Sequence, residues 1–197
     1  MAKKPLPCPT VLRQLLRYEA ETGKLFWKER SPIWVKSGKR SSSTQCAVWN
    51  AKYAGEEAFK FVTPYGYLSG KVFNKSHLAH RVVWAIFFGA WPSQHIDHIN
   101  GDRLDNRIKN LRDVSQAENN RNLSLSKINT SGFTGVYWCA RDKWWVSKIK
   151  VSGRDRFLGN YKHKQDAIDA RIQANVRYQF HENHGKPLDS NRPAIGK

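Results

Sequence analysis

The sequence has few of the residues that build zinc-bound, disulfide-bonded or membrane-spanning proteins. Its three cysteines, Cys8, Cys46 and Cys139, lie far apart and form no CxxC pair, which excludes a local four-cysteine zinc site and argues against a disulfide scaffold. The longest apolar run, Val82–Phe88, has seven residues, whereas a helix that crosses a bilayer needs about 20. Because no charged-then-apolar signal segment opens the chain, we expect neither secretion nor membrane insertion.

Acidic side chains are scarce as well: 16 Asp and Glu face 34 Lys and Arg in 197 residues, a net charge of +18. The excess is uneven, with +9 in residues 1–75, +1 in residues 76–125 and +8 in residues 126–197. Basic segments of this size indicate a polyanionic partner, although a solvated basic surface is the simpler alternative. The carboxylates of the neutral centre would repel phosphate unless a cation lies between them.

The N-terminal part of the chain predicts small elements separated by turns. The expected elements are, in order, a helix over Val11–Glu19 capped by Thr10, a strand over Lys24–Lys28, a loop over residues 30–52, strands around turns within Tyr65–Phe73, and an apolar helix over His80–Gly89 that ends at its glycine.

Residues 93–122 are dense in His, Asp and Asn and poor in apolar residues. Two short strands, His95–Asp97 and Leu111–Val114, enclose a long polar loop. Ser115 and Glu118 match a capping box, which predicts that a helix begins there. The expected local order is therefore strand, long loop, strand, helix.

Asp97 and His98 stand side by side at the end of the first of these strands. A carboxylate is a hard ligand that suits Mg²⁺, and an imidazole, which titrates near neutrality, can take a proton from water. Two amides are placed to assist: Asn110 can orient the imidazole, and Asn119 lies at the start of the helix. An Asp–His pair alone is common, and a surface turn is the more frequent explanation of such a pair.

The full central stretch resembles the HNH endonucleases, in particular the homing and phage types. The matching residues are His95 and His98 with Asp97 between them, Asn100-Gly101, Asp105-Asn106-Arg107, Asn110-Leu111-Arg112 and Glu118-Asn119-Asn120-Arg121-Asn122. The resemblance implies that His98 is the general base, Asp97 a metal ligand, Asn110 the residue that orients the base, and Asn119 the ligand that completes the metal site.

Many HNH members carry histidine where this chain has Asn119, so the chain resembles the H-N-N variant. The amide oxygen favours one Mg²⁺ (or Mn²⁺) over a nitrogen-preferring ion such as Zn²⁺. Zinc-stabilised relatives carry CxxC pairs, which this sequence lacks, so we expect no structural zinc. Other residues keep two interpretations: His80 and His95 contact phosphate or are structural, and Arg107 and Arg112 contact phosphate or form salt bridges.

The C-terminal third predicts a small sheet with one helix, between a polar linker (123–131) and a loose tail (184–197). The expected elements are strands over Gly135–Ala140, Trp144–Val151 and Arg156–Leu158 and a helix over Gln165–Phe180, whose stripe of Ile168, Ile172 and Val176 is predicted to face the sheet.

Alternation along Trp144–Val151 places cations beside aromatic side chains on the face away from the helix. Such a face suits phosphate and base contacts, although an ordinary solvated sheet would look similar. The stretches Ser131–Trp138, Lys143–Lys150 and Phe157–Tyr161 resemble an AP2/ERF-type DNA-binding domain, which implies a three-stranded sheet in the major groove. The DNA-binding residues implied on this chain are Tyr137, Arg141, Trp144, Lys148, Lys150, Arg154 and Phe157.

Together these expectations describe a modular α+β protein, with a ββα-metal HNH core and an AP2-type three-stranded antiparallel sheet carrying one packed helix. The expected segments are a basic N-terminal region (1–75), the nuclease core (76–122), the linker (123–131), the DNA-binding domain (132–183) and the tail (184–197).

The predicted function is Mg²⁺-dependent hydrolysis of phosphodiester bonds in double-stranded DNA, with one strand nicked per active site. Double-strand cleavage would then need self-association or two sequential events. Two alternatives stay open: a non-catalytic AP2-type DNA-binding protein with an inactive nuclease core, and an RNA-binding protein that stacks bases on its aromatic side chains. The resemblance places the protein in the cytoplasm of a bacterial or phage-infected cell.

Overall fold

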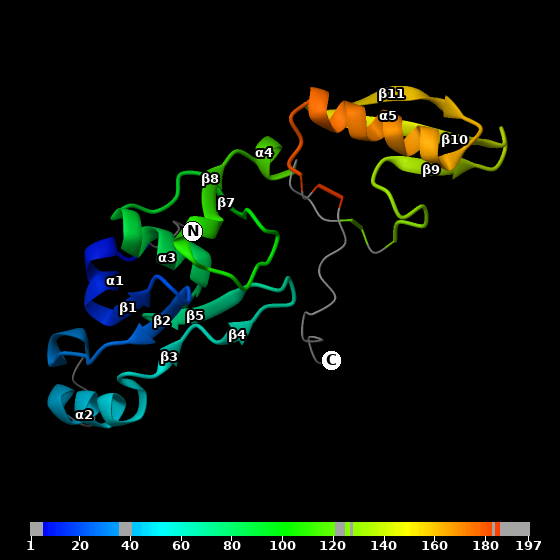
Figure 1. The fold of residues 1–197 in the computed structure, drawn as a ribbon. Helices are drawn as coiled ribbons and strands as arrows, with labels where there is room; N and C mark the ends of the chain where they lie inside the picture. The colour runs from blue at the N-terminus through cyan, green and yellow to red at the C-terminus, as the bar shows by residue number, and fades with distance from the viewer. Residues whose placement is uncertain (1–5, 36–40, 121–124, 127, 183, 186–197) are drawn as a thin grey trace, which may run out of the picture. The chain divides into compact units, whose positions relative to one another are not determined.

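The computed structural model describes residues 6–35, 41–120, 125–126, 128–182 and 184–185. These residues divide into two compact units: the first runs to His98 and resumes over Asp102–Asp113, and the second takes Ile99–Gly101 and the chain from Val114 through the last described residues. Both units mix helices and strands, which agrees with the α+β class expected from the sequence (Figure 1). The expected linker and tail lie partly outside the described residues.

The first unit is built from short elements that pair locally. Its strands form three sheets, in the orders β1-β2-β3, β4-β5-β6 and β7-β8. The elements in chain order are α1 (Pro9–Leu15), β1 (Leu16–Glu19), β2 (Lys24–Trp27), the 3₁₀ turn η1 (Pro32–Trp34), α2 (Ser42–Tyr53), β3 (Glu57–Ala58), β4 (Phe61–Val62), β5 (Leu68–Val72), β6 (Lys75–Leu78), α3 (Ala79–Phe88), β7 (His95–His98), the 3₁₀ turn η2 (Ile108–Asn110) and β8 (Leu111–Val114).

The prediction of one helix over Val11–Glu19 is wrong in its second half. α1 ends at Leu15, its N-cap is Cys8 rather than Thr10, and the next four residues form β1. β1 pairs antiparallel with β2, from Leu16 opposite Trp27 to Glu19 opposite Lys24. The strand forms in place of the helix because the turn after Glu19 brings β2 alongside, where the two strands pair and Leu16 is buried. The helix-like spacing of the apolar residues does not reveal this contact between strands.

The prediction of a loop over residues 30–52 is also wrong, because most of its second half forms α2. Ser41 caps this helix, its hydroxyl accepting a hydrogen bond from the amide of Thr44 at 3.2 Å. The helix also packs on the preceding chain: the guanidinium of Arg30 lies 3.6 Å from the ring centroid of Trp49. Asn50 of the helix also exchanges two hydrogen bonds with the backbone of Arg30, at 2.8 and 3.1 Å. The cap and these contacts with the preceding chain therefore stabilise a helix in a polar sequence.

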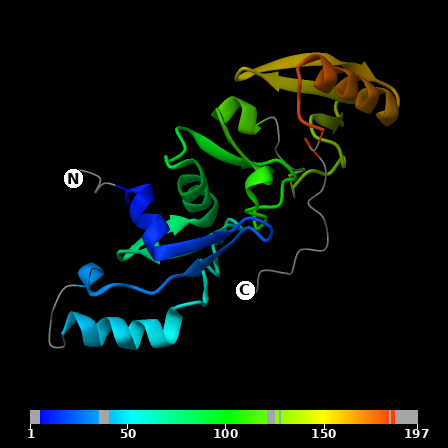
Figure 2. The ribbon, with the colours of Figure 1, turned by 60° about the vertical axis from the view of Figure 1, so that its left-hand side comes forward.

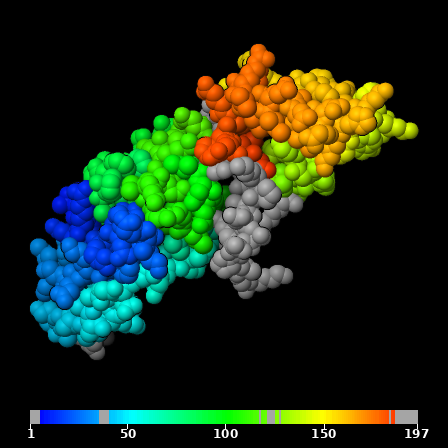
Figure 3. Space-filling view, viewed as in Figure 1, coloured from blue at the N-terminus to red at the C-terminus, as the bar shows by residue number. Residues whose placement is uncertain are grey.

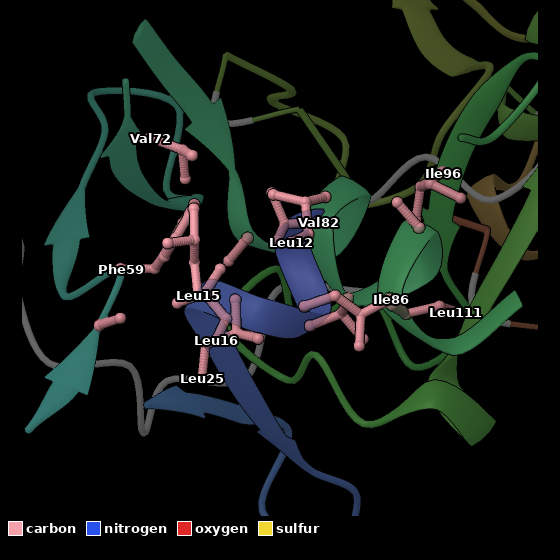
Figure 4. Packing of buried hydrophobic residues seen from close by; sticks show 14 residues of the cluster. Leu12, Leu15, Leu16, Leu25, Phe59, Val72, Val82, Ile86, Ile96 and Leu111 are labelled. Carbon is pink, nitrogen blue, oxygen red and sulfur yellow. The ribbon is translucent and has the colours of Figure 1, made fainter. Parts of the chain in front are cut away.

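One apolar core holds the first unit together. Figure 4 shows Leu12 of α1 beside Val82 of α3, and Ile86 of α3 extending toward Leu111 of β8. The same cluster includes Val72 and other residues that precede position 76. Residues on both sides of the expected boundary at 75/76 therefore contribute to a single core.

α3 confirms the predicted apolar helix with its ends shifted by one residue. Gly89 follows it in the left-handed conformation, φ 74°, and its amide donates to the carbonyl of Ala85, as a glycine C-cap requires. Within the described ranges, none of the helices combines the length and apolarity needed to span a membrane.

The second unit contains α4 (Gln116–Asn120), β9 (Val136–Cys139), β10 (Trp144–Val151), β11 (Arg154–Tyr161) and α5 (Lys164–Arg177). The three strands form an antiparallel sheet in the order β11-β10-β9. α5, orange, lies along one face of this sheet, yellow (Figures 1 and 2). Figure 3 shows the atoms of the sheet and α5, yellow to orange, lying against one another.

The second unit corrects one expectation about packing. Ile172 and Val176 of the predicted stripe are exposed, and α5 instead buries Ala167, Arg171 and Ala174. Alanines at the contact let the helix approach the sheet closely. The prediction that the apolar stripe faces the sheet is therefore wrong for Ile172 and Val176. Arg171 instead occupies a buried position on the inner face of α5.

Candidate functional site

β7 carries two polar residues into the interior of the first unit. Its burial runs from an exposed His95 to buried Ile96, Asp97 and His98. Ile96 belongs to the apolar core, so it anchors the strand. Because neighbouring side chains of a strand point to opposite faces, Asp97 and His98 meet different partners.

The ring of His98 is fixed by an amide. His98 is 4% exposed and Asn106 is 1% exposed, and 3.2 Å separate Nε2 of His98 from Oδ1 of Asn106. Nδ2 of Asn106 donates to the carbonyl of Leu104 at 3.4 Å, which turns the amide oxygen toward the imidazole. His98 therefore donates through Nε2, and Nδ1 is the basic nitrogen of the neutral ring.

Two further rings pack against His98. The ring of His80 meets it edge-on, with centroids 5.2 Å apart, and the ring of Tyr67 lies 6.0 Å away. Tyr67 also contacts His80 edge-on at 5.0 Å. His80 is buried, and its Nδ1 has no hydrogen-bond partner in the part of the chain that is described. This packing favours the structural interpretation of His80.

Burial lowers the pKa of both imidazoles. The pKa of His80 falls from 6.5 to about 3, since burial disfavours the charged ring and His98 and Arg81 act in the same direction. Burial also lowers the pKa of His98, although the hydrogen bond to Asn106 and the charge of Asp97 oppose the shift. Both rings are therefore neutral at pH 7, the form in which His98 can accept a proton.

The arginines left open by the sequence form salt bridges here. Oδ2 of Asp97 accepts hydrogen bonds from Nε and Nη2 of Arg112, at 2.8 and 2.6 Å. Arg107 binds both carboxylate oxygens of Asp105, at 2.7 and 2.6 Å. Each arginine thereby neutralises a carboxylate of the central segment.

The loop that carries Asn106 rests on the N-terminal hairpin. The hydroxyl of Tyr18 in β1 accepts a hydrogen bond from the amide of Ile108 at 2.9 Å and donates to the carbonyl of Asn106 at 3.2 Å. In the β1–β2 turn, Gly23 has φ +75°, and a Cβ there would lie 2.5 Å from the amide nitrogen of Arg107. Only glycine lets the two segments approach this closely.

Sequence reasoning named Asn110 as the residue that orients His98 and missed Asn106. Asn110 donates from Nδ2 to the carbonyl of Asp105 at 2.8 Å, so it holds the residue before Asn106. A direct role of Asn110 at His98 stays a prediction. The missed signal was the Asp105-Asn106-Arg107 stretch, which the resemblance already contained. Tyr18 lies in an N-terminal stretch that also resembles the family, but the resemblance gave it no role at the site.

The predicted capping box at the start of α4 is confirmed. The amide of Ser115 donates to Oε2 of Glu118 at 2.9 Å, and the amide of Glu118 donates to Oγ of Ser115 at 3.3 Å. Asn119 lies one residue further along this helix, in the second unit. Binding of one ion by Asp97 and Asn119 together therefore stays a prediction, and so does a phosphate contact of the exposed His95.

The carboxylate of Asp97 is a hard oxygen ligand of the kind that binds Mg²⁺. Asp97 offers a carboxylate, and the described residues hold no cluster of three or more His, Cys, Asp and Glu that could bind a metal. Mg²⁺ is commonly held by one or two carboxylates together with waters and substrate phosphates. The guanidinium of Arg112 competes with such an ion for Oδ2 of Asp97.

The sheet of the second unit presents aromatic and basic side chains on the face away from α5. Nζ of Lys148 lies 5.6 Å from the ring centroid of Tyr137, and Lys148 stands opposite Phe157, which is 67% exposed. Lys150 and Arg154 are exposed and Trp144 is half-buried. Arg141, also exposed, pairs with Asp142 at 2.8 Å in the β9–β10 turn.

A family match covers the centre of the chain. Residues 77–121 match the family described as HNH endonuclease, a range that includes β7, β8, α4, His80 and the loop with Asn106. The chain therefore carries an HNH endonuclease domain. No solved structure matches the chain.

Two curated phage and prophage proteins are similar to this chain. Protein 3.8 of Escherichia phage T7 is 34% identical over 87 residues, which make up 44% of this chain and 72% of that protein. YosQ, an SPbeta prophage-derived protein of Bacillus subtilis (strain 168) whose name gives the provisional description HNH homing endonuclease, is 29% identical over 97 residues, 46% of this chain and 51% of that protein. The chain belongs to the same family as protein 3.8.

Proposed function

We propose that this chain is a divalent-metal-dependent endonuclease of the homing or phage type, which hydrolyses phosphodiester bonds in double-stranded DNA. One arrangement carries the proposal: a buried, neutral His98, fixed through Nε2 by Asn106, stands next to Asp97 at the end of β7. The HNH match over residues 77–121 supports it.

In the proposed reaction, Nδ1 of His98 takes a proton from the water that attacks phosphorus. General base catalysis of this kind contributes about 10²- to 10⁴-fold to the rate. The ring becomes positive as it gains the proton, and the negative charges of Asp97, Asp102 and Asp105 favour that form. Asn106 keeps the ring from rotating, so the same nitrogen faces the water in every turnover.

The proposed metal ligands are Asp97 and Asn119, with Mg²⁺ or Mn²⁺ as the ion. A bound divalent ion would supply positive charge at the phosphate and at the leaving oxygen. Arg112 is the resident cation at Asp97 in this structure, and its two hydrogen bonds orient the carboxylate. Arg107 and His95 are proposed to contact the phosphate backbone.

The second unit is proposed to bind duplex DNA as an AP2-type module. Its support is the antiparallel sheet β9-β10-β11, backed by α5, with Tyr137, Lys148 and Phe157 together on the open face. Lysines beside exposed rings suit phosphate and base contacts. Nicking of one strand per site follows from a single HNH segment per chain, and double-strand cleavage would need self-association.

The test is a supercoiled-plasmid assay with wild type and His98→Ala, each with Mg²⁺ and with EDTA. We expect nicked circles only for wild type with Mg²⁺, and equal duplex binding by both proteins in a gel-shift assay. Full activity of His98→Ala would remove His98 as the base. Duplex binding without any nicking, on plasmids and on phage and host genomic DNA, would favour the non-catalytic DNA-binding alternative.

A further inference from the structure

α5 buries an arginine where a packed helix ordinarily buries an apolar residue. Arg171 is 2% exposed and lies between the buried Ala167 and Ala174. Burial lowers its pKa to about 10, which leaves the guanidinium charged at pH 7. A buried charge lowers stability unless a partner of opposite charge or a full set of hydrogen bonds compensates it.

The described partners of Arg171 compensate it only in part. Nε donates to the carbonyl of Thr134 at 3.1 Å, Nη2 lies 3.1 Å from Nε2 of His184, and the ring of Phe180 lies 5.3 Å from the guanidinium carbon. Nη1 is buried and has no hydrogen-bond partner among the residues that the structure describes. None of these contacts brings a negative charge.

Arg171 lines a cavity of about 440 Å³, together with Lys148 and Lys150. Asp155 is the carboxylate in this lining, and it pairs with Lys148 at 3.4 Å rather than with Arg171. Gly135 lets the backbone lie close to Arg171 in the wall of the cavity: its φ is +78°, and a Cβ there would lie 2.9 Å from Nε of Arg171. The lining of the cavity therefore includes three basic residues, Arg171, Lys148 and Lys150, and one carboxylate.

We propose that this cavity binds a phosphate group, with Nη1 of Arg171 as a hydrogen-bond donor and Lys148 and Lys150 as the flanking charges. A guanidinium with an unused N–H suits a phosphate oxygen as its acceptor. The lining carries more positive than negative charge, so a phosphate, which is an anion, would balance charge that Asp155 alone does not.

The source of the phosphate that the geometry favours is the DNA backbone, an assignment that rests on the proposed DNA binding of the second unit. Lys148 belongs both to the cavity lining and to the open sheet face, where it lies over Tyr137. A duplex held on that face would therefore bring its backbone to a residue of the cavity. A free phosphate ion is the other source of the same chemistry.

The first experiment titrates the full chain with inorganic phosphate at constant ionic strength, with chloride as the matched anion, and follows the melting temperature. We expect phosphate to raise it for wild type and for Arg177→Gln, an exposed arginine of the same helix, and not for Arg171→Gln. Lys150→Ala, a surface change that leaves the core intact, should weaken the phosphate effect several-fold. Equal phosphate and chloride curves for wild type would overturn the proposal.

The second experiment measures duplex binding against salt. Loss of one phosphate contact lowers the log–log slope by about 0.9, so we expect that change for Arg171→Gln and not for Arg177→Gln. If a DNA phosphate fills the cavity, inorganic phosphate should no longer raise the melting temperature of the DNA-bound wild type. If it still raises that temperature, the cavity takes the free ion and the assignment to the DNA backbone is wrong. Failure of wild type to bind duplex would defeat the proposed function, whereas the phosphate titration would stand by itself.

Discussion

At the scale of single residues, the environment of His98 leaves the neutral imidazole with one basic nitrogen, which the proposed general base requires. Burial keeps the ring neutral, and one hydrogen bond from Nε2 to Asn106 decides which nitrogen holds the lone pair. The assignment depends on Asn106, whose own amide is oriented by the carbonyl of Leu104. We therefore expect Asn106 to position His98, and substitutions of Asn106 that keep or remove the acceptor to differ in their effect on nicking.

Asn106→Leu should reduce nicking strongly, because it leaves the buried Nε2–H without an acceptor. Asn106→Asp keeps an acceptor and adds a negative charge beside the ring, which raises the pKa of His98. We expect Asn106→Asp to retain much more activity than Asn106→Leu, with the acid limb of its pH–rate profile moved to higher pH. Equal losses and unchanged profiles would show that Asn106 only supports the fold.

His80 makes stability depend on pH in a defined window. Its pKa is about 3 in the folded chain and about 6.5 when unfolded, so the unfolded state binds more protons between these values. Stability is therefore lost as pH falls below 6.5, by about 2 kcal/mol between pH 7 and pH 5.

His80→Phe should flatten this dependence, since a ring of similar shape replaces one whose Nδ1 has no described partner. The measurement is urea unfolding at several pH values. His77, whose pKa burial also lowers, remains in both proteins and cancels in the difference. His98 also remains, but the substitution removes its interaction with His80, so the difference reports His80 together with that interaction. Parallel stability curves for the two proteins would contradict the assignment.

At the scale of elements, the β1–β2 hairpin positions the loop that holds Asn106. Gly23→Ala would press a methyl group on the backbone of Asn106 and Arg107. Gly55→Ala is the matched control: its φ is +83°, and a Cβ there meets nothing within 4 Å. Both changes place alanine in the left-handed region, at a cost of about 1 kcal/mol, but only Gly23→Ala should also slow nicking and lower stability further.

This pair is measured by urea unfolding and by plasmid nicking under the same conditions. A Gly23→Ala protein that nicks as fast as Gly55→Ala would show that the hairpin does not position the loop.

Elements specified by local signals could be predicted, and those specified by tertiary contacts could not. β8, β10 and the Ser115–Glu118 capping box follow from alternation and capping, and the structure has them where the sequence puts them. α2 packs through Trp49 against the guanidinium of Arg30, and α1 ends where the next residues pair with β2. Both depend on contacts between segments that local patterns do not reveal. The same holds at the site: the Asp97–His98 pair is visible in the sequence, whereas Asn106 and Tyr18 join it only through the fold.

At the scale of the whole molecule, the two units divide the expected tasks. Each is compact by itself, and residues 126–197 carry a net charge of +8. Removal of residues 126–197 should weaken duplex binding, lower its salt dependence and broaden the choice of cleavage sites, while residual nicking remains. Salt-dependent gel shifts and mapping of nicks on one plasmid measure these effects, and an unchanged cleavage pattern would contradict a specificity role for the second unit.

The contact of Tyr18 with Asn106 and Ile108 also bears on which part of the chain could be transferred to another protein as a unit. The family match begins at residue 77, yet the loop that aims His98 is bonded to a hydroxyl from β1 and shares its apolar core with Leu12. A recombination event that transferred only the matched segment would leave this support behind. A transferred segment that keeps these contacts therefore has to begin upstream of Leu12, in the basic N-terminal region.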